Sequence, residues 1–193
     1  MATTGILQRG AAPGIRYPAY FATAGYQLCE NDPPRFLSES TLLEGAITAE
    51  MDFLSLATLC EALVDELIEC QSATARLALA GRLACALERL DAALSRDIPP
   101  HRLAALTVAE LPERLPEHLG SDTETLGQYC RALTAALITR ALAPEIERTL
   151  AGLLFDLVNH LAEWVKTPCF VLTPQGYLND EGQLVAPRDN AVS

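Results

Sequence analysis

The sequence predicts an all-α protein: a four-helix bundle made of two similar helical hairpins, with an extended N-terminal arm and a small C-terminal β-hairpin. Three observations predict this fold. Leucine and alanine recur at helical spacing over four long segments, prolines lie between the segments, and the two halves align with each other at a nearly constant offset. At 193 residues and 50% hydrophobic, the chain is long enough to bury one core and too short to favour two large domains.

Residues 1–37 are expected to form an extended arm. The segment contains four prolines and several glycines, and it shows no sustained helical period. Aromatic residues gather between Ile15 and Tyr26. We therefore expect this part of the arm to lie against the body of the protein or against a partner.

The first hairpin is predicted over 41–96. Thr41, with Glu44 three residues later, has the spacing of a capping box at a helix start. Apolar residues then recur at i, i+3, i+4 and i+7, the pattern of an amphipathic helix. They are Leu43, Ile47, Met51, Leu54, Leu56, Leu59, Cys60, Leu63, Val64, Leu67 and Ile68. A break is expected at 71–74, and a second helix follows until the Pro99-Pro100 pair, which cannot continue it.

A connector over 97–120 leads to the second hairpin, predicted over 121–167. The prolines of the connector allow short helical turns at most. The third helix is expected to start near Ser121, with Glu124 as its capping partner. Pro144 suits the first turn of the fourth helix, expected over 145–166, because its missing N–H is not needed there.

The fourth helix is apolar on two faces. We expect its principal stripe to consist of Ile146, Leu150, Leu153, Leu157, Leu161, Trp164 and Val165. A second, smaller face carries Ala151, Gly152, Phe155 and Ala162. A helix of this kind is central in a bundle or lies at a subunit interface. Phe155 is therefore predicted to pack against the arm, the C-terminal hairpin or a second copy of the chain, which makes a homodimer one candidate assembly.

Residues 168–193 depart from the helical pattern. Short apolar runs on either side of the turn at 179–182 predict two β-strands. An isolated hairpin is only marginally stable in water, so we expect this one to pack on the helices.

The two hairpins resemble each other in sequence. Adding 70 to the residue number matches Cys60 with Cys130, and an offset of 71 matches Gly81 with Gly152. A glycine inside a helix costs about 1 kcal/mol relative to alanine. We therefore expect both glycines to lie where neighbouring helices cross, if the hairpins arose by duplication.

Charge and hydropathy exclude several classes of partner. The net charge of −11 gives no basic surface for a nucleic acid backbone. The longest apolar stretch, 150–165, is interrupted by Asp156, Asn159, His160 and Glu163, so no membrane span is expected. The N-terminal residues lack the pattern of a secretory signal. We therefore expect a cytoplasmic protein, and the predominance of arginine over a single lysine, Lys166, suggests bacterial coding.

The six cysteines include no C-x-x-C pair and are expected to be reduced thiols packed as small apolar side chains. In an exported protein, Cys60 could instead pair with Cys85 or Cys130. No catalytic, phosphate-binding or zinc motif is present, and nothing selects one thiol as a nucleophile for His101 or His118. Neither a metal nor another cofactor is predicted.

One histidine has acidic neighbours at helical spacing. Asp156 and Glu163 share one side of the fourth helix with His160, but the order is His-x-x-Glu and no second copy exists, unlike the pattern of di-iron bundles. We interpret the three residues as surface groups that make ordinary hydrogen bonds.

Three acidic residues form the most distinctive charged feature. Glu61, Asp65 and Glu69 repeat every four residues, where like charges destabilise a helix slightly. The row is either a solvated face or a docking surface for a basic protein partner.

The sequence therefore favours a non-catalytic protein-binding scaffold of a bacterium or phage, of the immunity, inhibitor, adaptor or secretion-chaperone type. The alternative is a small helical ligand-binding or metal-binding protein, with or without enzymatic activity. Its pocket would lie between the hairpins and would be lined by Cys60, Tyr129, Cys130 and Trp164.

Overall fold

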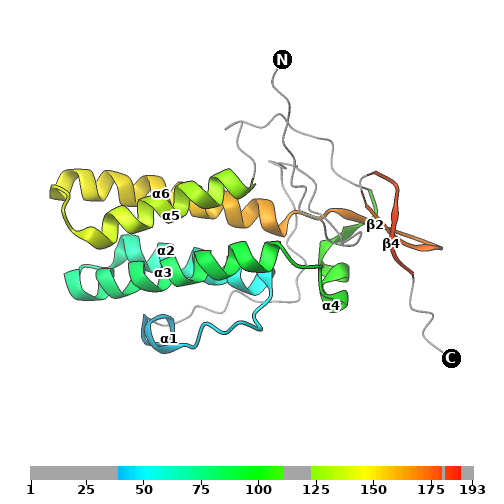
Figure 1. Ribbon diagram of the computed structural model, residues 1–193, viewed down its shortest axis with the longest axis horizontal. Coiled ribbons are helices and arrows are strands. Elements are labelled where there is room, and N and C mark those ends of the chain that lie inside the picture. The colour runs from blue at the N-terminus through cyan, green and yellow to red at the C-terminus, as the bar shows by residue number, and fades with distance from the viewer. Residues whose placement is uncertain (1–38, 111–122, 180, 188–193) are drawn as a thin grey trace, which may run out of the picture.

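The computed structural model describes residues 39–110, 123–179 and 181–187. In these ranges the protein is mostly helical and carries a small β-sheet toward its C-terminus (Figure 1). The predicted N-terminal arm (1–37), the expected helix start at Ser121 and the residues from Arg188 onward lie outside the described ranges. No helix among the described residues is both long enough and apolar enough to cross a membrane.

The elements follow the chain in this order: α1 (Glu39–Glu44), α2 (Phe53–Glu69), α3 (Ala73–Leu94), α4 (Pro100–Leu103), the 3-10 turn η1 (Ala104–Leu106), β1 (Thr107–Val108), α5 (Thr123–Thr139), α6 (Pro144–Lys166), β2 (Phe170–Thr173), β3 (Gly176–Leu178) and β4 (Leu184–Pro187).

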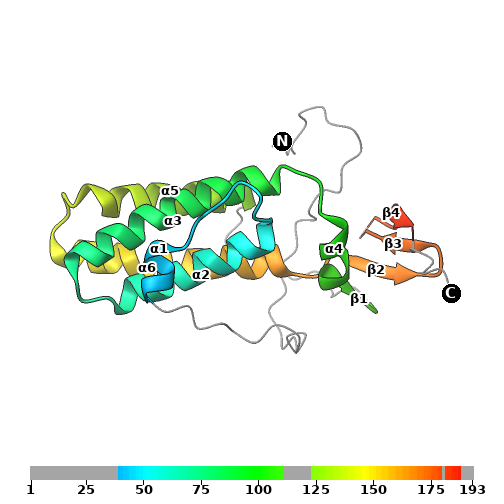
Figure 2. The same ribbon diagram turned by 90° about the horizontal axis from the view of Figure 1, so that it is seen from below.

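The four long helices lie side by side. Helix α2 contacts α3 and α6, and α5 contacts the same two helices. The links α2–α3 and α5–α6 lie at one end of the helical region, and the sheet lies at the other (Figures 1 and 2). Each long helix buries one stripe of residues between its two neighbours, and these stripes meet in a single core of buried leucine, alanine, valine and cysteine side chains.

The first predicted helix was wrong at its start. The chain forms the short α1, leaves the helical conformation at Gly45 and resumes at α2, so Glu44 lies in the last turn of α1 and not in a capping box. The carboxylate of Asp52 caps α2, since its Oδ1 accepts a hydrogen bond from the Ser55 N–H at 3.0 Å. Because this cap starts a new helix at Phe53, the apolar spacing that predicted one continuous helix does not describe this part of the chain.

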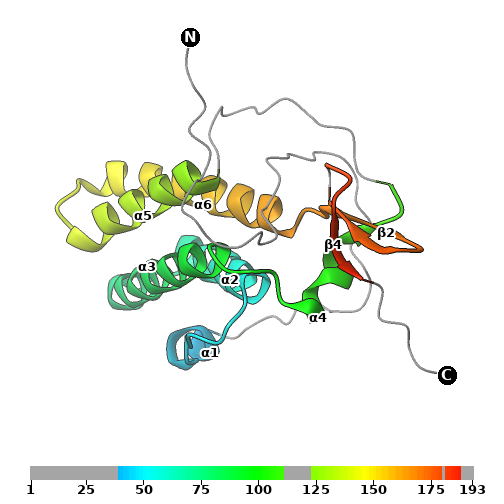
Figure 3. The same cartoon turned by 45° about the vertical axis from the view of Figure 1, so that its right-hand side comes forward.

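The segment between α1 and α2 is held on the outer side of α3 (Figure 3). The side chain of Arg82 donates to the carbonyl oxygen of Gly45, and Arg96 Nη1 donates to that of Ala49 at 3.2 Å. Leu42 of α1 is buried and belongs to the core cluster. Two backbone carbonyl groups that a helix would satisfy internally are therefore satisfied here by Arg82 of α3 and by Arg96, which follows the end of that helix.

The principal stripe predicted for α6 was also wrong in part. Ile146 and Leu153 are 52% and 45% exposed, whereas Ala151 and Ala162 belong to the core. The buried stripe of α6 consists of Ala151, Leu154, Val158, Leu161, Ala162, Trp164 and Val165. Small residues such as alanine allow close approach of neighbouring helices, which fits the burial of Ala151 and Ala162 in the core.

The two matched glycines do not mark helix crossings. Gly81 is exposed, Gly152 is half-buried, and a Cβ atom added to either would meet nothing within 4 Å. This finding removes the glycine argument for duplication. The other informative match remains as an observation, because Cys60 and Cys130 are both buried in the core.

The C-terminal residues form a larger sheet than predicted. The expected hairpin exists as β3 and β4, with Gly182 at φ 74° in its turn, but β2 and β1 extend it to the order β1-β2-β3-β4. Strand β1 belongs to the connector, where no strand was expected, and it pairs parallel with β2 in the register Thr107↔Phe170. Phe170 is fully buried, so the sheet is anchored to the core as expected.

Candidate interaction surface

The predicted acidic row on α2 does not present three equivalent charges. Lys166 of α6 forms an ion pair with Glu61, and both side chains are about one-third to one-quarter exposed. Asp65 and Glu69 are exposed. Glu61 therefore contributes to the contact between α2 and α6, which leaves Asp65 and Glu69 as the exposed acids of the row.

Asp65 also has a local neighbour. Burial raises the pKa of its carboxyl group, and a hydrogen bond with the side chain of Asn159 offsets part of that effect. Asn159 in turn donates to the carbonyl oxygen of Phe155 at 3.0 Å. Among the described residues the row is thus partly integrated into the α2–α6 contact.

Cys60 and Cys130, the two cysteines matched by the internal repeat, are both buried in the interior. Burial raises the pKa of Cys60 strongly, and the neighbouring thiol of Cys130 adds to the effect. Burial raises the pKa of Cys130 to about 12, against a small opposing effect of Arg131. Since the thiolate is the reactive form, these raised pKa values and the burial of both side chains argue against either thiol as a nucleophile near neutral pH.

The remaining candidate residues divide between interior and surface. Trp164 is buried together with the two cysteines, whereas Tyr129 is 50% exposed. Phe155 is half-buried and packs against the core cluster. The structure therefore does not bring Tyr129 to the interior where a pocket between the hairpins was considered, and Phe155 is largely engaged within the chain.

The exposed apolar side chains of α5 and α6 define a surface that we call the α5–α6 strip. It consists of the exposed Tyr129, Ile146 and Leu153 and the half-buried Leu133, Leu150 and Leu157. On α6 these residues follow the spacing 4, 3, 4, which is the repeat of a helix-packing seam.

Ion pairs with other helices fix the orientation of the strip. Lys166 contacts α2, and at 100° per residue Ile146 and Leu153 lie about 140–160° away from it around the axis of α6. Arg131 contacts Asp91 of α3 at 3.2 Å, and Tyr129 lies about 160° away from Arg131 around α5. The exposed residues of both helices thus lie along the line where α5 and α6 adjoin.

The strip is continuous across the two helices. Tyr129 lies ten residues before the end of α5, and Leu153 lies nine residues after the start of α6. Because α5 and α6 are antiparallel and joined by the short link 140–143, the two residues lie at nearly the same depth from the turn. Leu133 and Leu150 correspond in the same way, so both helices contribute to one surface.

Acidic residues border the strip on α6. Glu145, Asp156 and Glu163, which we call the acidic rim, are exposed and form no ion pair with another described residue. They lie about 80° from the exposed Ile146 and Leu153, and about 100° from the centre of the strip, on the most outward side of the helix. The neighbouring outward positions of α5 are uncharged: Thr125, Ala132 and Ala136.

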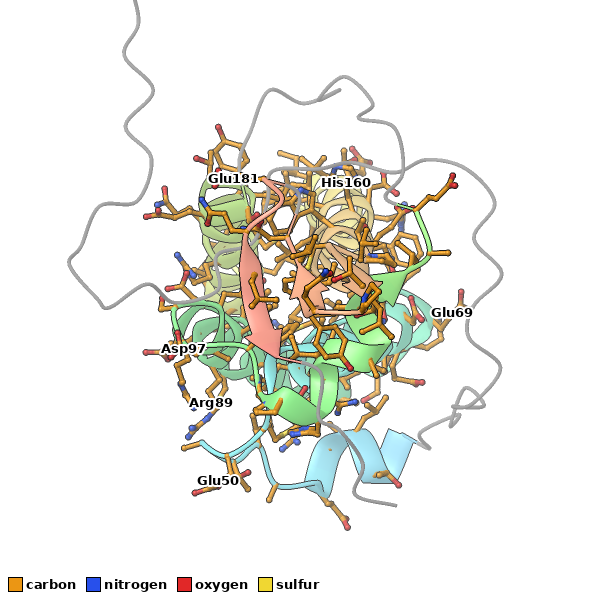
Figure 4. The ribbon with its side chains drawn as sticks, turned by 90° about the vertical axis from the view of Figure 1, so that its right-hand side faces the viewer. Glu50, Glu69, Arg89, Asp97, His160 and Glu181 are labelled. Carbon is orange, nitrogen blue, oxygen red and sulfur yellow. The ribbon has the colours of Figure 1, made fainter. Side chains whose placement is uncertain are left out.

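No metal site is formed by the described part of the chain: no group of three or more His, Cys, Asp or Glu side chains could hold an ion there. Asp156, His160 and Glu163 are thus not arranged as a ligand set. His160 is half-buried and lies on the outer side of α6, seven residues beyond Leu153 and so on the line of Ile146 and Leu153 (Figure 4).

Sequence reasoning missed the strip because it assigned the same residues to the core. Helix α6 carries two overlapping apolar stripes, and spacing alone cannot decide which one faces the neighbours. The signal that could have separated them is residue size, since Ala151 and Ala162 accompany the buried stripe.

Together, the elements define a mostly helical protein with a small C-terminal sheet and an apolar strip beside an acidic rim. Searches among protein-family models, curated proteins and solved structures find no match to this chain.

Proposed function

We propose that this protein is a non-catalytic protein-binding scaffold and that the α5–α6 strip is its binding surface. The four long helices act in this proposal as a four-helix bundle of two hairpins that holds the strip rigid. Immunity or inhibitor proteins, adaptors and secretion chaperones of bacteria or phage are the roles that such a scaffold would suit, in the cytoplasm.

One observation carries the proposal. Three large apolar side chains, Tyr129, Ile146 and Leu153, are each about half exposed along one line of the surface. Exposed apolar residues are common singly, but an aligned group beside charged residues is typical of protein interaction sites. Tyrosine is in addition enriched in interface cores, because its ring buries a large area while its hydroxyl stays hydrogen-bonded.

The alternative function, ligand binding between the hairpins, has less support. Its candidate residues Cys60 and Cys130 are buried with raised pKa values, and Tyr129 lies on the surface. Two of its four candidate residues are thus thiols packed in the core, and a third lies outside it.

The proposal is tested by comparing two matched substitutions. Leu153→Asp places a charge in the strip, and Leu77→Asp places one at a leucine of α3 that is 38% exposed and lies far from the strip in the chain. The full-length wild type and both variants are used as baits in extracts of the organism that encodes the chain. We expect a specific protein to be retained by the wild type and by Leu77→Asp but lost with Leu153→Asp.

Circular dichroism and urea unfolding check that both variants remain folded, as expected for half-exposed positions. Retention of the same protein by all three baits would overturn the assignment of the strip as the binding surface.

A further inference from the structure

From the strip and its rim we infer the chemical class of the partner: an amphipathic α-helix whose apolar face is flanked on one side by basic residues. The inference rests on the proposed function, since it names what binds to the α5–α6 strip.

The spacing of the strip favours a helix as the occupant. Ile146 and Leu153, like Leu150 and Leu157, are separated by seven residues, so the apolar side chains of α6 repeat every two helical turns. From Ile146 to Leu157 the strip extends about 16 Å, which corresponds to three turns of a helix. A partner helix with apolar residues at the same 3,4 spacing places its side chains between those of α6, as in ordinary helix packing.

The antiparallel neighbour supplies the second side of the contact. Tyr129 and Leu133 of α5 lie at the depths of Leu153 and Leu150, so a partner helix lying along the strip touches both α5 and α6. This is the arrangement in which amphipathic helices dock onto helical proteins, with anchors at i, i+3, i+4 and i+7.

The charged residues beside the strip indicate which charge the edge of the partner helix should carry. Asp156 and Glu163 are seven residues apart and lie on the same side of α6, and Glu145 precedes them on that side. The outward residues of α5 are neutral. Basic residues along one edge of the partner helix would therefore meet the acidic rim, while the other edge needs no charge.

The net charge of the chain also favours a basic partner. At −11 the protein attracts basic partners over a distance, which raises association rates at low ionic strength. A second copy of the chain carries the same acidic rim and the same net charge, so self-association through the strip is opposed by like charges.

Two designed peptides test the inference on the full-length protein. Both are three-heptad amphipathic helices with leucine at the a and d positions, and they differ only in having lysine or glutamate at one flanking position of each heptad. Fluorescence anisotropy measures their binding at low and at physiological ionic strength. We expect the lysine peptide to bind at least tenfold more tightly than the glutamate peptide, with affinity that falls as salt is raised.

Charge reversals locate the contact. The double variant Asp156→Lys/Glu163→Lys should weaken binding of the lysine peptide threefold to tenfold. The matched control, Asp65→Lys/Glu69→Lys, changes the net charge equally on the acidic row of α2 and should have a smaller effect. If the control weakens binding as much as the rim variant does, the attraction comes from the overall charge and the inference is overturned.

The remaining outcomes separate the inference from the proposed function. Equal binding of both peptides that is lost with Leu153→Asp would contradict a basic partner and still support the strip as a binding surface. If neither peptide binds, the inference of a helical partner fails, and the bait comparison decides the proposed function independently. A wild type that sediments as a dimer and a Leu153→Asp variant that sediments as a monomer would identify a second copy as the occupant.

Discussion

The guanidinium of Arg102 donates two hydrogen bonds to one carboxylate oxygen of Asp52, 50 residues earlier, from Nη2 at 2.9 Å and from Nε at 3.1 Å. Asp52 caps α2, and Arg102 belongs to α4, which leads into the sheet. Arg102 Nη2 also donates to Ser55 Oγ at 2.9 Å. The start of α2 and the connector that positions the sheet are therefore fixed by the same side chain.

Replacing Asp52 by alanine should lower the free energy of unfolding by about 1–2 kcal/mol, the usual loss for an N-cap residue. The variant also leaves the half-buried Arg102 without its carboxylate. Urea unfolding of the wild type and Asp52→Ala measures the difference. Asp97→Ala, at an exposed acid near the end of α3, is the control and should change the stability by less than about 0.5 kcal/mol (Figure 4).

The cost of the Asp52 substitution should depend on pH. Burial alone acts to raise the pKa of Asp52, but hydrogen bonds from Ser55 and Arg102 and the charge of Arg102 outweigh it and hold the pKa below its ordinary value of 3.8. A lowered pKa stabilises the folded state above pH 3.8, and this contribution is lost as the pH falls through the folded-state pKa. If the difference in the free energy of unfolding between the wild type and Asp52→Ala stayed constant down to pH 2, this account would be wrong.

Asp65 should show the opposite dependence. Its pKa is raised by burial, so the folded state disfavours the carboxylate relative to the unfolded state. Asp65→Asn should therefore raise the free energy of unfolding at neutral pH, and the gain should disappear as the pH falls below 3.8, where the carboxyl group is protonated in both states. Thermal unfolding between pH 3 and 7 measures the effect. A destabilised Asn variant at pH 7 would show that the charge of Asp65 is favourable.

Adjacent leucines of α6 test which of its two apolar stripes lies inside. Leu154 is fully buried and Leu153 is 45% exposed. Leu154→Ala should cost about 2–5 kcal/mol because it leaves a cavity in the core, whereas Leu153→Ala should cost less than about 1 kcal/mol. Chemical denaturation of the two variants gives both values. If both variants lost the same stability, Leu153 would be packed in the core as Leu154 is, as the spacing alone predicted.

Prolines and apolar spacing predicted the helix boundaries that depend only on residues close by in the chain. The prediction of Pro144 at the first position of α6 is confirmed, as is the end of α3 before the Pro99-Pro100 pair. In both places a residue's own backbone chemistry fixes the boundary. The class of fold, mostly helical with a C-terminal hairpin, followed from the same kind of signal.

The parts that failed depend on partners distant in the chain. Arg102 reaches the cap of α2 from 50 residues away, and β1 forms only because Thr107 pairs with Phe170. The candidate site failed for a related reason. Whether Leu153 or Leu154 faces the core depends on where α2 and α5 pack, and periodicity within α6 does not contain that information.

The two glycines matched by the internal repeat give the last prediction. A Cβ atom at Gly81 or Gly152 would meet nothing within 4 Å, and both residues lie inside helices. Alanine there should raise the free energy of unfolding by about 0.5–1 kcal/mol at each position, through its higher helix propensity. Gly45→Ala is the control, since its Cβ would lie 2.7 Å from the carbonyl oxygen of Thr41 and should destabilise the end of α1. Thermal unfolding of the three variants measures the changes. Loss of stability in Gly81→Ala and Gly152→Ala would mean that both positions share a requirement for glycine, and would thereby revive the case for duplication of the hairpins.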